Sequence, residues 1–348
     1  MNPIRSLKKG MTRSVTVMIF LFPAAGFMHA HAQQLEWKTG FFGFFDNREY
    51  FNTFIIPQTI GGANISAEAG FAVNANNRFR AGLSYTYEYG SKGDYLLPDV
   101  ILYYKGEWKP FTFYIGSFPR YQLISQPLAL LTDTLLYYRP MVEGMFLEYR
   151  RFWGSQNIWL DWTSRQTDTK RETFLIGATG RIHKGLFLWQ HHFLMYHFAG
   201  PAIDIPGDHI RDNGGFSAMP GLNLGNLLGL DTLIFSTGFL MSYDQLRHVY
   251  DVRFMWGSLT DLEISHRGFG LHGVYYRGDG QVFLYGDGFY KSSSYGRADV
   301  YYQKNWEDKI SGKLTFSFHF LPGNLDLSFS LHMRVFMDGT VKLGQRNL

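Results

Sequence analysis

Cysteine is absent from the 348 residues of this chain. Its absence excludes disulfide bonds and any lipid anchor attached through a cysteine. Beyond residue 32 the chain also lacks a long apolar run, so the sequence predicts no transmembrane helix, which needs about twenty such residues. An all-helical membrane protein would be far more apolar than this chain, whose mean hydropathy is −0.16.

The first 32 residues have the pattern of a cleaved secretory signal peptide. Four basic residues precede an apolar stretch at 14–22 that is too short to span a bilayer, and Ala30-His31-Ala32 forms a cleavage site. We therefore expect the mature domain to cover residues 33–348. The same four basic residues account for the excess of 33 lysines and arginines over 29 acidic residues. The mature chain is then near neutral, and nothing in its composition favours a nucleic-acid partner.

Segments of about ten residues with alternating apolar and polar side chains fill the rest of the chain. In residues 78–89, Phe79 and Leu83 fall on one face of a strand, whereas Arg80 and Glu88 fall on the other. Sixteen such segments cover residues 35–45, 64–73, 78–89, 99–108, 111–118, 143–152, 158–165, 172–182, 186–198, 215–225, 231–243, 251–266, 269–277, 295–304, 310–321 and 325–337.

The connections between these segments alternate in length. Those after odd-numbered segments are mostly long and the others short, which is typical of outer-membrane barrels with long extracellular loops and short periplasmic turns. The sequence thus predicts an all-β, transmembrane antiparallel β-barrel of about sixteen strands (roughly 14 to 18) in a bacterial outer membrane. A soluble β-sandwich or jelly roll also alternates, but it rarely needs so many strands.

A barrel in the outer membrane should contact two partners: the lipid of that membrane and the machinery that inserts barrels. The last segment alternates and ends near Phe336, as does the C-terminal strand by which such barrels are recognised. The chain continues for twelve residues beyond it, which we expect to form a short periplasmic tail.

Three short motifs resemble the porin-like outer-membrane barrels of Bacteroidota. They are Phe118-Pro119-Arg120, the run DTLLYYRP at 133–140 followed by Glu143-Gly144, and the run DWTSRQ at 161–166. The resemblance covers roughly residues 116–174. It implies the barrel fold and the outer membrane, but no agreed activity is attached to that group.

Charged side chains on the strands are the first candidates for function. A barrel of this size encloses water, and a charge on the lipid face costs a few kcal/mol at the midplane, so these groups should point inward. They could orient polar solutes in a pore, or brace the wall as salt bridges. The pore-lining candidates are Arg78, Arg80, Glu88, Asp161, Arg165, Arg297, Asp299 and Arg334.

The segment 119–140 is the second candidate, because ordered loops of this length are usually functional. Its apolar middle, at 128–131, is unlikely to be exposed to water on the cell surface. It could fold into the barrel and constrict it, it could dock a partner protein, or it could form a simple ordered cap. Arg120, Asp133 and Arg139 would be its charged contacts with the lumen.

The twelve histidines of the chain could bind a metal or take part in catalysis. His209 lies among loop aspartates that could hold a divalent cation, but no zinc-type spacing occurs, so we expect no metal and no cofactor. Ser242, Asp244 and His248 cluster without a nucleophile signature. We therefore expect no enzymatic activity.

The sequence as a whole predicts an outer-membrane channel for passive or weakly selective diffusion of small polar solutes. The alternative is a non-conducting accessory barrel of an outer-membrane complex, with segment 119–140 docked on a partner protein. A homo-oligomer stays open as well, because lipid and a neighbouring barrel favour the same side chains.

Overall fold

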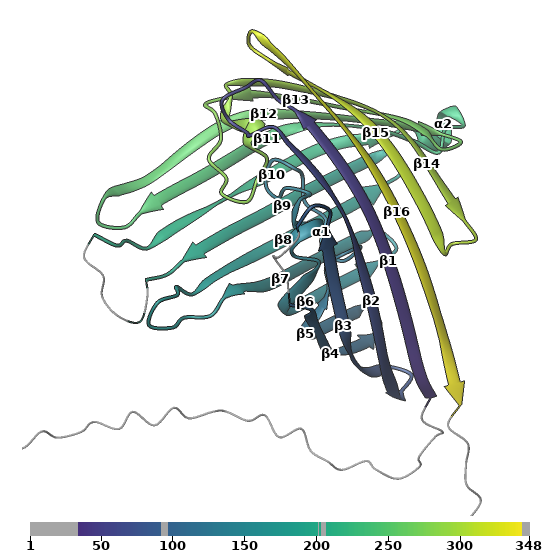
Figure 1. The fold of residues 1–348 in the computed structure, drawn as a ribbon. Helices are drawn as coiled ribbons and strands as arrows, with labels where there is room; N and C mark the ends of the chain where they lie inside the picture. Colours follow the sequence, from purple (N-terminus) through teal and green to yellow (C-terminus); the bar gives the residue numbers. More distant parts are fainter. Residues whose placement is uncertain (1–33, 92–96, 201, 203–206, 343–348) are drawn as a thin grey trace, which may run out of the picture.

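The computed structural model describes residues 34–91, 97–200, 202 and 207–342, so the predicted signal peptide and the end of the predicted tail lie outside it. Within these residues sixteen strands form one closed barrel (Figure 1). The strands are β1 Gln34–Glu49, β2 Gln58–Asn74, β3 Asn77–Glu88, β4 Asp99–Trp108, β5 Phe111–Pro119, β6 Met141–Arg151, β7 Gly154–Ser164, β8 Thr173–Lys184, β9 Phe187–Phe198, β10 Arg211–Asn223, β11 Thr232–Leu246, β12 Tyr250–His266, β13 Phe269–Gly278, β14 Ser294–Trp306, β15 Ile310–Leu321 and β16 Asn324–Lys342.

Each strand pairs antiparallel with its neighbours in the sequence, and β16 returns to pair with β1. The closing ladder runs from Gln34↔Lys342 to Glu49↔Leu327. Closure allows a sheet to cross a bilayer, because the backbone amides and carbonyls of the first and last strands then hydrogen-bond to each other. The predicted sixteen-strand antiparallel barrel is confirmed.

Several strands are longer than the sequence predicted; β2, for example, begins at Gln58 instead of Asn64. β1 continues through Asp46 to Glu49, which were assigned to a loop because they are polar, and β16 continues past Phe336 to Lys342. The extension of β1 pairs with β16 and β2, and the extension of β16 pairs with β1. Cross-strand pairing keeps these polar residues in the sheet, although their local sequence favours a turn.

The helical segments are short and lie in the connections. They are α1 Leu135–Tyr138 between β5 and β6, α2 Gly225–Leu228 between β10 and β11, and the 3₁₀ helix η1 Gly288–Lys291 between β13 and β14. Among the described residues, no helix has both the length and the apolar character needed to cross a membrane.

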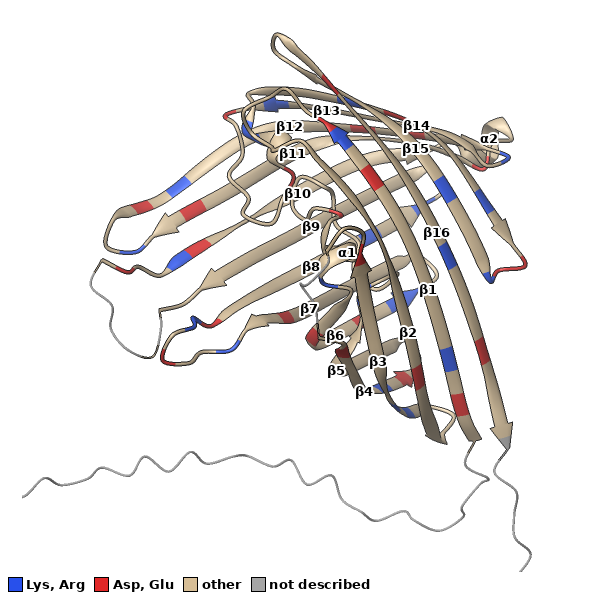
Figure 2. Cartoon of the chain, viewed as in Figure 1, with Lys and Arg blue, Asp and Glu red and all other residues tan. Residues whose placement is uncertain are grey.

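The inner surface of the barrel has two different halves. Charged residues recur along β1 and β16 (Figure 2), and the polar wall formed by β12–β16 and β1 includes the buried or half-buried side chains of Asp261, His272, Asp299, His319, Ser328, Asp326 and Asp46. The opposite apolar wall carries the buried side chains of Phe146, Trp159, Leu175, Leu194, Met219, Leu240 and Leu259.

Candidate functional site

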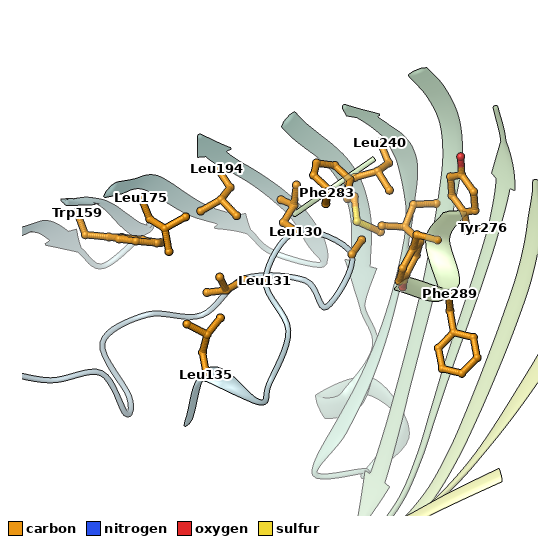
Figure 3. Close-up of a cluster of buried hydrophobic side chains, with 14 of the residues drawn as sticks. Leu130, Leu131, Leu135, Trp159, Leu175, Leu194, Leu240, Tyr276, Phe283 and Phe289 are labelled. Carbon is orange, nitrogen blue, oxygen red and sulfur yellow. The ribbon is translucent and has the colours of Figure 1, made fainter. Parts of the chain in front are cut away.

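Two inward-folded connections pack on the apolar wall. Leu130, Leu131 and Leu135 of the connection between β5 and β6 point toward wall residues such as Leu194, and Phe283 joins them from the connection between β13 and β14 (Figure 3). All of these side chains are at most 8% exposed. We call residues 120–140 and 279–293 together the plug.

The two parts of the plug are joined by backbone hydrogen bonds. The amide of Thr132 donates to the carbonyl of Tyr285 (2.7 Å), and the amide of Asp287 donates to that of Leu128 (2.8 Å). They cross so closely that a Cβ on Gly286 would lie 2.0 Å from the carbonyl oxygen of Ala129. The lumen therefore contains an apolar core at this height, where the sequence predicted an aqueous passage.

A serine and a histidine meet on the polar wall. Nε2 of His319 on β15 lies 3.1 Å from Oγ of Ser328 on β16, and its Nδ1 lies 2.8 Å from the hydroxyl of Tyr295 on β14. Phe289 of η1 stacks on the imidazole at 4.2 Å. The hydroxyl of Ser328, the imidazole of His319 and the hydroxyl of Tyr295 thus form a chain of contacts. This is the arrangement of a nucleophile, its base and a group that orients the base.

A second histidine lies nearby under α1. Nε2 of His332 on β16 is 2.7 Å from the hydroxyl of Tyr137, which also donates to Asp46 at 3.4 Å. Burial raises the pKa of Tyr137, so its hydroxyl keeps its proton. This cluster holds an acid, a phenol and a base, but among the described residues no serine or threonine hydroxyl is hydrogen-bonded to the imidazole.

A small cavity of about 80 Å³ adjoins the second cluster inside the barrel. It lies between β1, β2 and β16 on one side and Pro119, Tyr121 and Gln122 on the other. Its charged lining groups are Lys38, Glu68 and Arg334. The volume holds a few water molecules but no lipid chain.

Two of the predicted site residues, Arg78 and Arg80, lie in an ion-pair network on β1–β4, and a third, Glu88, contacts the plug. Arg78 contacts Glu107 at 2.6 Å and Glu36 at 3.5 Å, and Arg80 pairs with Glu36. Glu88 accepts a hydrogen bond from the hydroxyl of Tyr138 in α1 (3.3 Å). These contacts brace the wall, which was one of the two roles left open; any effect on solutes stays a prediction.

Three others meet at the start and end of segment 120–140. Arg120 is 1% exposed and pairs with Asp161 on β7, and its guanidinium also donates to the carbonyls of Arg139 and Met141. Arg139 approaches Asp161 at 3.7 Å. Arg120 and Asp161 are therefore buried where the plug joins the barrel wall. Neither side chain faces a water-filled constriction.

The remaining candidates are dispersed. Asp133 contacts Arg48 at 3.4 Å, and the guanidinium of Arg334 covers the ring of Phe42 at 3.4 Å. Arg297 pairs with Asp299 at 2.7 Å. Arg165 is an exposed residue that follows the last residue of β7, so its predicted place on the inner wall is wrong.

The hydrolytic cluster considered from the sequence does not form. Ser242 Oγ accepts from the amide of Val282, and Asp244 pairs with Arg211 at 2.9 Å. Sequence reasoning missed His319, Ser328 and Tyr295 because they come from three strands. Alternation does place each on an inward face, but only the strand register brings them together.

A closed antiparallel barrel whose outward faces are apolar defines this molecule as an outer-membrane β-barrel protein. The sequence profile of the family described as Lipid A 3'-O-deacylase-type matches residues 27–342. The chain belongs to this family. The expectation that the protein is not an enzyme is thereby corrected, because the family is named for an enzymatic activity.

Solved structures support the fold alone, because their sequences are distant. A loop-deletion mutant of OmpT from Vibrio cholerae is 9% identical over 88% of this chain and 100% of its own, with a TM-score of 0.55. An anion-selective porin from Comamonas acidovorans is 8% identical over 88% and 99%, with a TM-score of 0.51. OmpF of Salmonella typhi in complex with daunomycin is 10% identical over 87% and 97%, with a TM-score of 0.50. No curated protein matches the sequence.

Proposed function

We propose that this protein is an outer-membrane hydrolase that releases an ester-linked acyl chain from a lipid of the lipid A class. Ser328 is the proposed nucleophile and His319 its general base. The family description supplies the class of reaction. The observation that carries the choice of residues is the 3.1 Å contact between His319 Nε2 and Ser328 Oγ, which lies within the range of a nucleophile and its base.

In the proposed mechanism His319 carries its hydrogen on Nδ1, toward Tyr295, and Nε2 takes the proton of Ser328. Oγ attacks the ester carbonyl carbon, the bond to the alcohol oxygen breaks, and His319 gives the proton to that oxygen. Water then hydrolyses the acyl-serine by the same route and releases the fatty acid. Arg48, which faces Ser328 across the β1–β16 ladder, would stabilise the oxyanion.

The connection between β1 and β2 supports a lipid substrate. It begins beside the Ser328 face of β16, since the amide of Phe51 and the side chain of Asn52 both donate to Asp326. The side chains of Phe51 and Ile56 are 77% and 81% exposed. Apolar groups at the extracellular rim suit contact with a lipid surface, and opening this connection would uncover the serine.

Diffusion of small polar solutes is the competing proposal. The porin-like fold supports it, but that fold hosts more than one function. The apolar plug counts against it, because a pore for polar solutes needs a hydrated path.

The test is an acyl-release assay on lipid A in mixed micelles, read by mass spectrometry. Ser328→Ala and His319→Ala should each lower the rate at least about 100-fold. Ser330→Ala is the matched control, because Ser330 lies two residues further along β16 on the same inner face. Full activity in Ser328→Ala would contradict the proposed nucleophile. If His332→Ala alone abolished activity, the cluster under α1 would be the site instead.

A further inference from the structure

The barrel wall splits at the extracellular end of β4 and β5. The ladder between these strands ends at Leu102↔Ser117, whereas β5 continues to pair with β6 as far as Pro119↔Met141. In the part of the chain that the structure describes, Asp99, Val100 and Ile101 therefore pair with β3 alone. Pro119 contributes to the split, because a proline has no amide hydrogen to donate to a neighbouring strand.

An outward groove of about 710 Å³ lies over this split. Its apolar lining comes from Val100, Ile115, Met145 and Trp162, all of which are at least 40% exposed. These side chains belong to the lipid-facing surface of the barrel. Gly116 also lines the groove, and its backbone lies so close to β4 that a Cβ there would be 2.1 Å from the carbonyl oxygen of Leu102.

Polar groups stand at the same place. Asp99, Ser117 and Glu143 line the groove together with the apolar residues. Among the described residues, 99–101 have a strand ladder on one side alone, and backbone groups outside a ladder are unfavourable in a bilayer unless a polar group satisfies them. On the lumen side, the small cavity is lined by Ile101, Pro119 and Met141, so the wall between groove and cavity is thin.

We propose that this groove binds one acyl chain of an outer-leaflet lipid and that hydrogen-bond donors of the lipid headgroup reach Asp99 and Glu143. Because the groove is part of the surface that faces the bilayer, a lipid is its occupant. The apolar lining of the groove contacts the acyl chain. The carboxylates of Asp99 and Glu143 and the backbone groups at the split accept hydrogen bonds from hydroxyl or ammonium groups of the lipid headgroup. This site goes beyond the proposed hydrolysis and does not depend on it.

The experiment uses phosphatidylethanolamine with a photoreactive acyl chain, in vesicles that contain the Ser328→Ala barrel. Crosslinks are mapped by mass spectrometry. We expect labelling of strands β4–β6 near Val100 and Met145 at least threefold above labelling near Ala298, and saturation at a few mole per cent of probe. Ala298 is the reference because it faces outward and, like Met145, lies four residues after the start of its strand.

Two blocking variants decide the result. Ser117→Trp fills the groove and should reduce the labelling to the level at Ala298, whereas Ala298→Trp should leave it unchanged. Met145→Trp provides the same block from another strand if Ser117→Trp fails to fold, which heat-modified gel mobility reveals. Uniform labelling around the barrel, or an excess that survives both blocks, would overturn the proposal. Since no hydrolysis is measured, failure of the proposed reaction would leave this result intact.

Discussion

Arg120 and Asp161 are almost completely buried and form a charge pair that water does not reach. Arg120 also ties the plug to the wall, because its amide donates to Pro140 and its guanidinium to Met141. A buried pair adds little net stability over apolar residues, but one charge left without the other is costly.

Arg120→Ala should therefore lower the free energy of unfolding by about 3 to 5 kcal/mol. The loss arises because the Asp161 carboxylate stays buried with only Arg139 at 3.7 Å and one amide as partners. Urea unfolding of the purified barrel, followed by tryptophan fluorescence, measures it. The double variant Arg120→Met with Asp161→Asn should lose less, since it leaves no unpaired charge; an equal or larger loss would show that packing dominates.

At the scale of elements, the connection between β13 and β14 combines apolar contacts with a half-buried acid, Asp287. Burial raises the pKa of Asp287 to about 6 from an ordinary value of 3.8. The folded state thus holds this proton more tightly than the unfolded chain does. The stabilisation that Asp287 contributes is then complete below about pH 4 and is lost as the pH rises through 6.

Asp287→Asn should remove this pH dependence and stabilise the protein at pH 7.5. Asp287 keeps some exposure to the lumen, where water screens part of the cost, so we expect a gain of about 1 to 2 kcal/mol. The asparagine oxygen can still accept the hydrogen bond from the amide of Phe289, which Asp287 now accepts at 3.2 Å. The measurement is urea unfolding of both proteins between pH 4 and 8; parallel curves would contradict the shifted pKa.

At the scale of the whole molecule, the plug packs on the apolar wall inside the barrel, and we expect it to close the path for ions. The wild-type protein should give no stable conductance steps in a planar bilayer, because its apolar core excludes hydrated ions. The variant Leu130→Asp with Phe283→Asp puts two carboxylates into the contact between the two halves of the plug, so it should produce channel openings. The strands carry their own ladders and should still fold, which heat-modified gel mobility checks. Stable wild-type steps would restore the channel prediction.

The sequence alone determined the strand number, the inward and outward faces and the closed barrel. It could do so because side-chain alternation is a local property with a period of two residues, and because a bilayer leaves few other solutions for such a chain. The inward positions of Arg78, Arg80 and Asp161 followed from the same rule.

The tertiary structure decided what lies inside the barrel. Alternation gives the face of a residue but not its neighbour, so the meeting of His319, Ser328 and Tyr295 depends on the register of three strands. The plug depends on contacts between connections more than a hundred residues apart, such as Leu130 with Phe283. Such contacts arise only when the closed wall brings distant segments together, and they put an apolar core inside the barrel, which the sequence had not predicted.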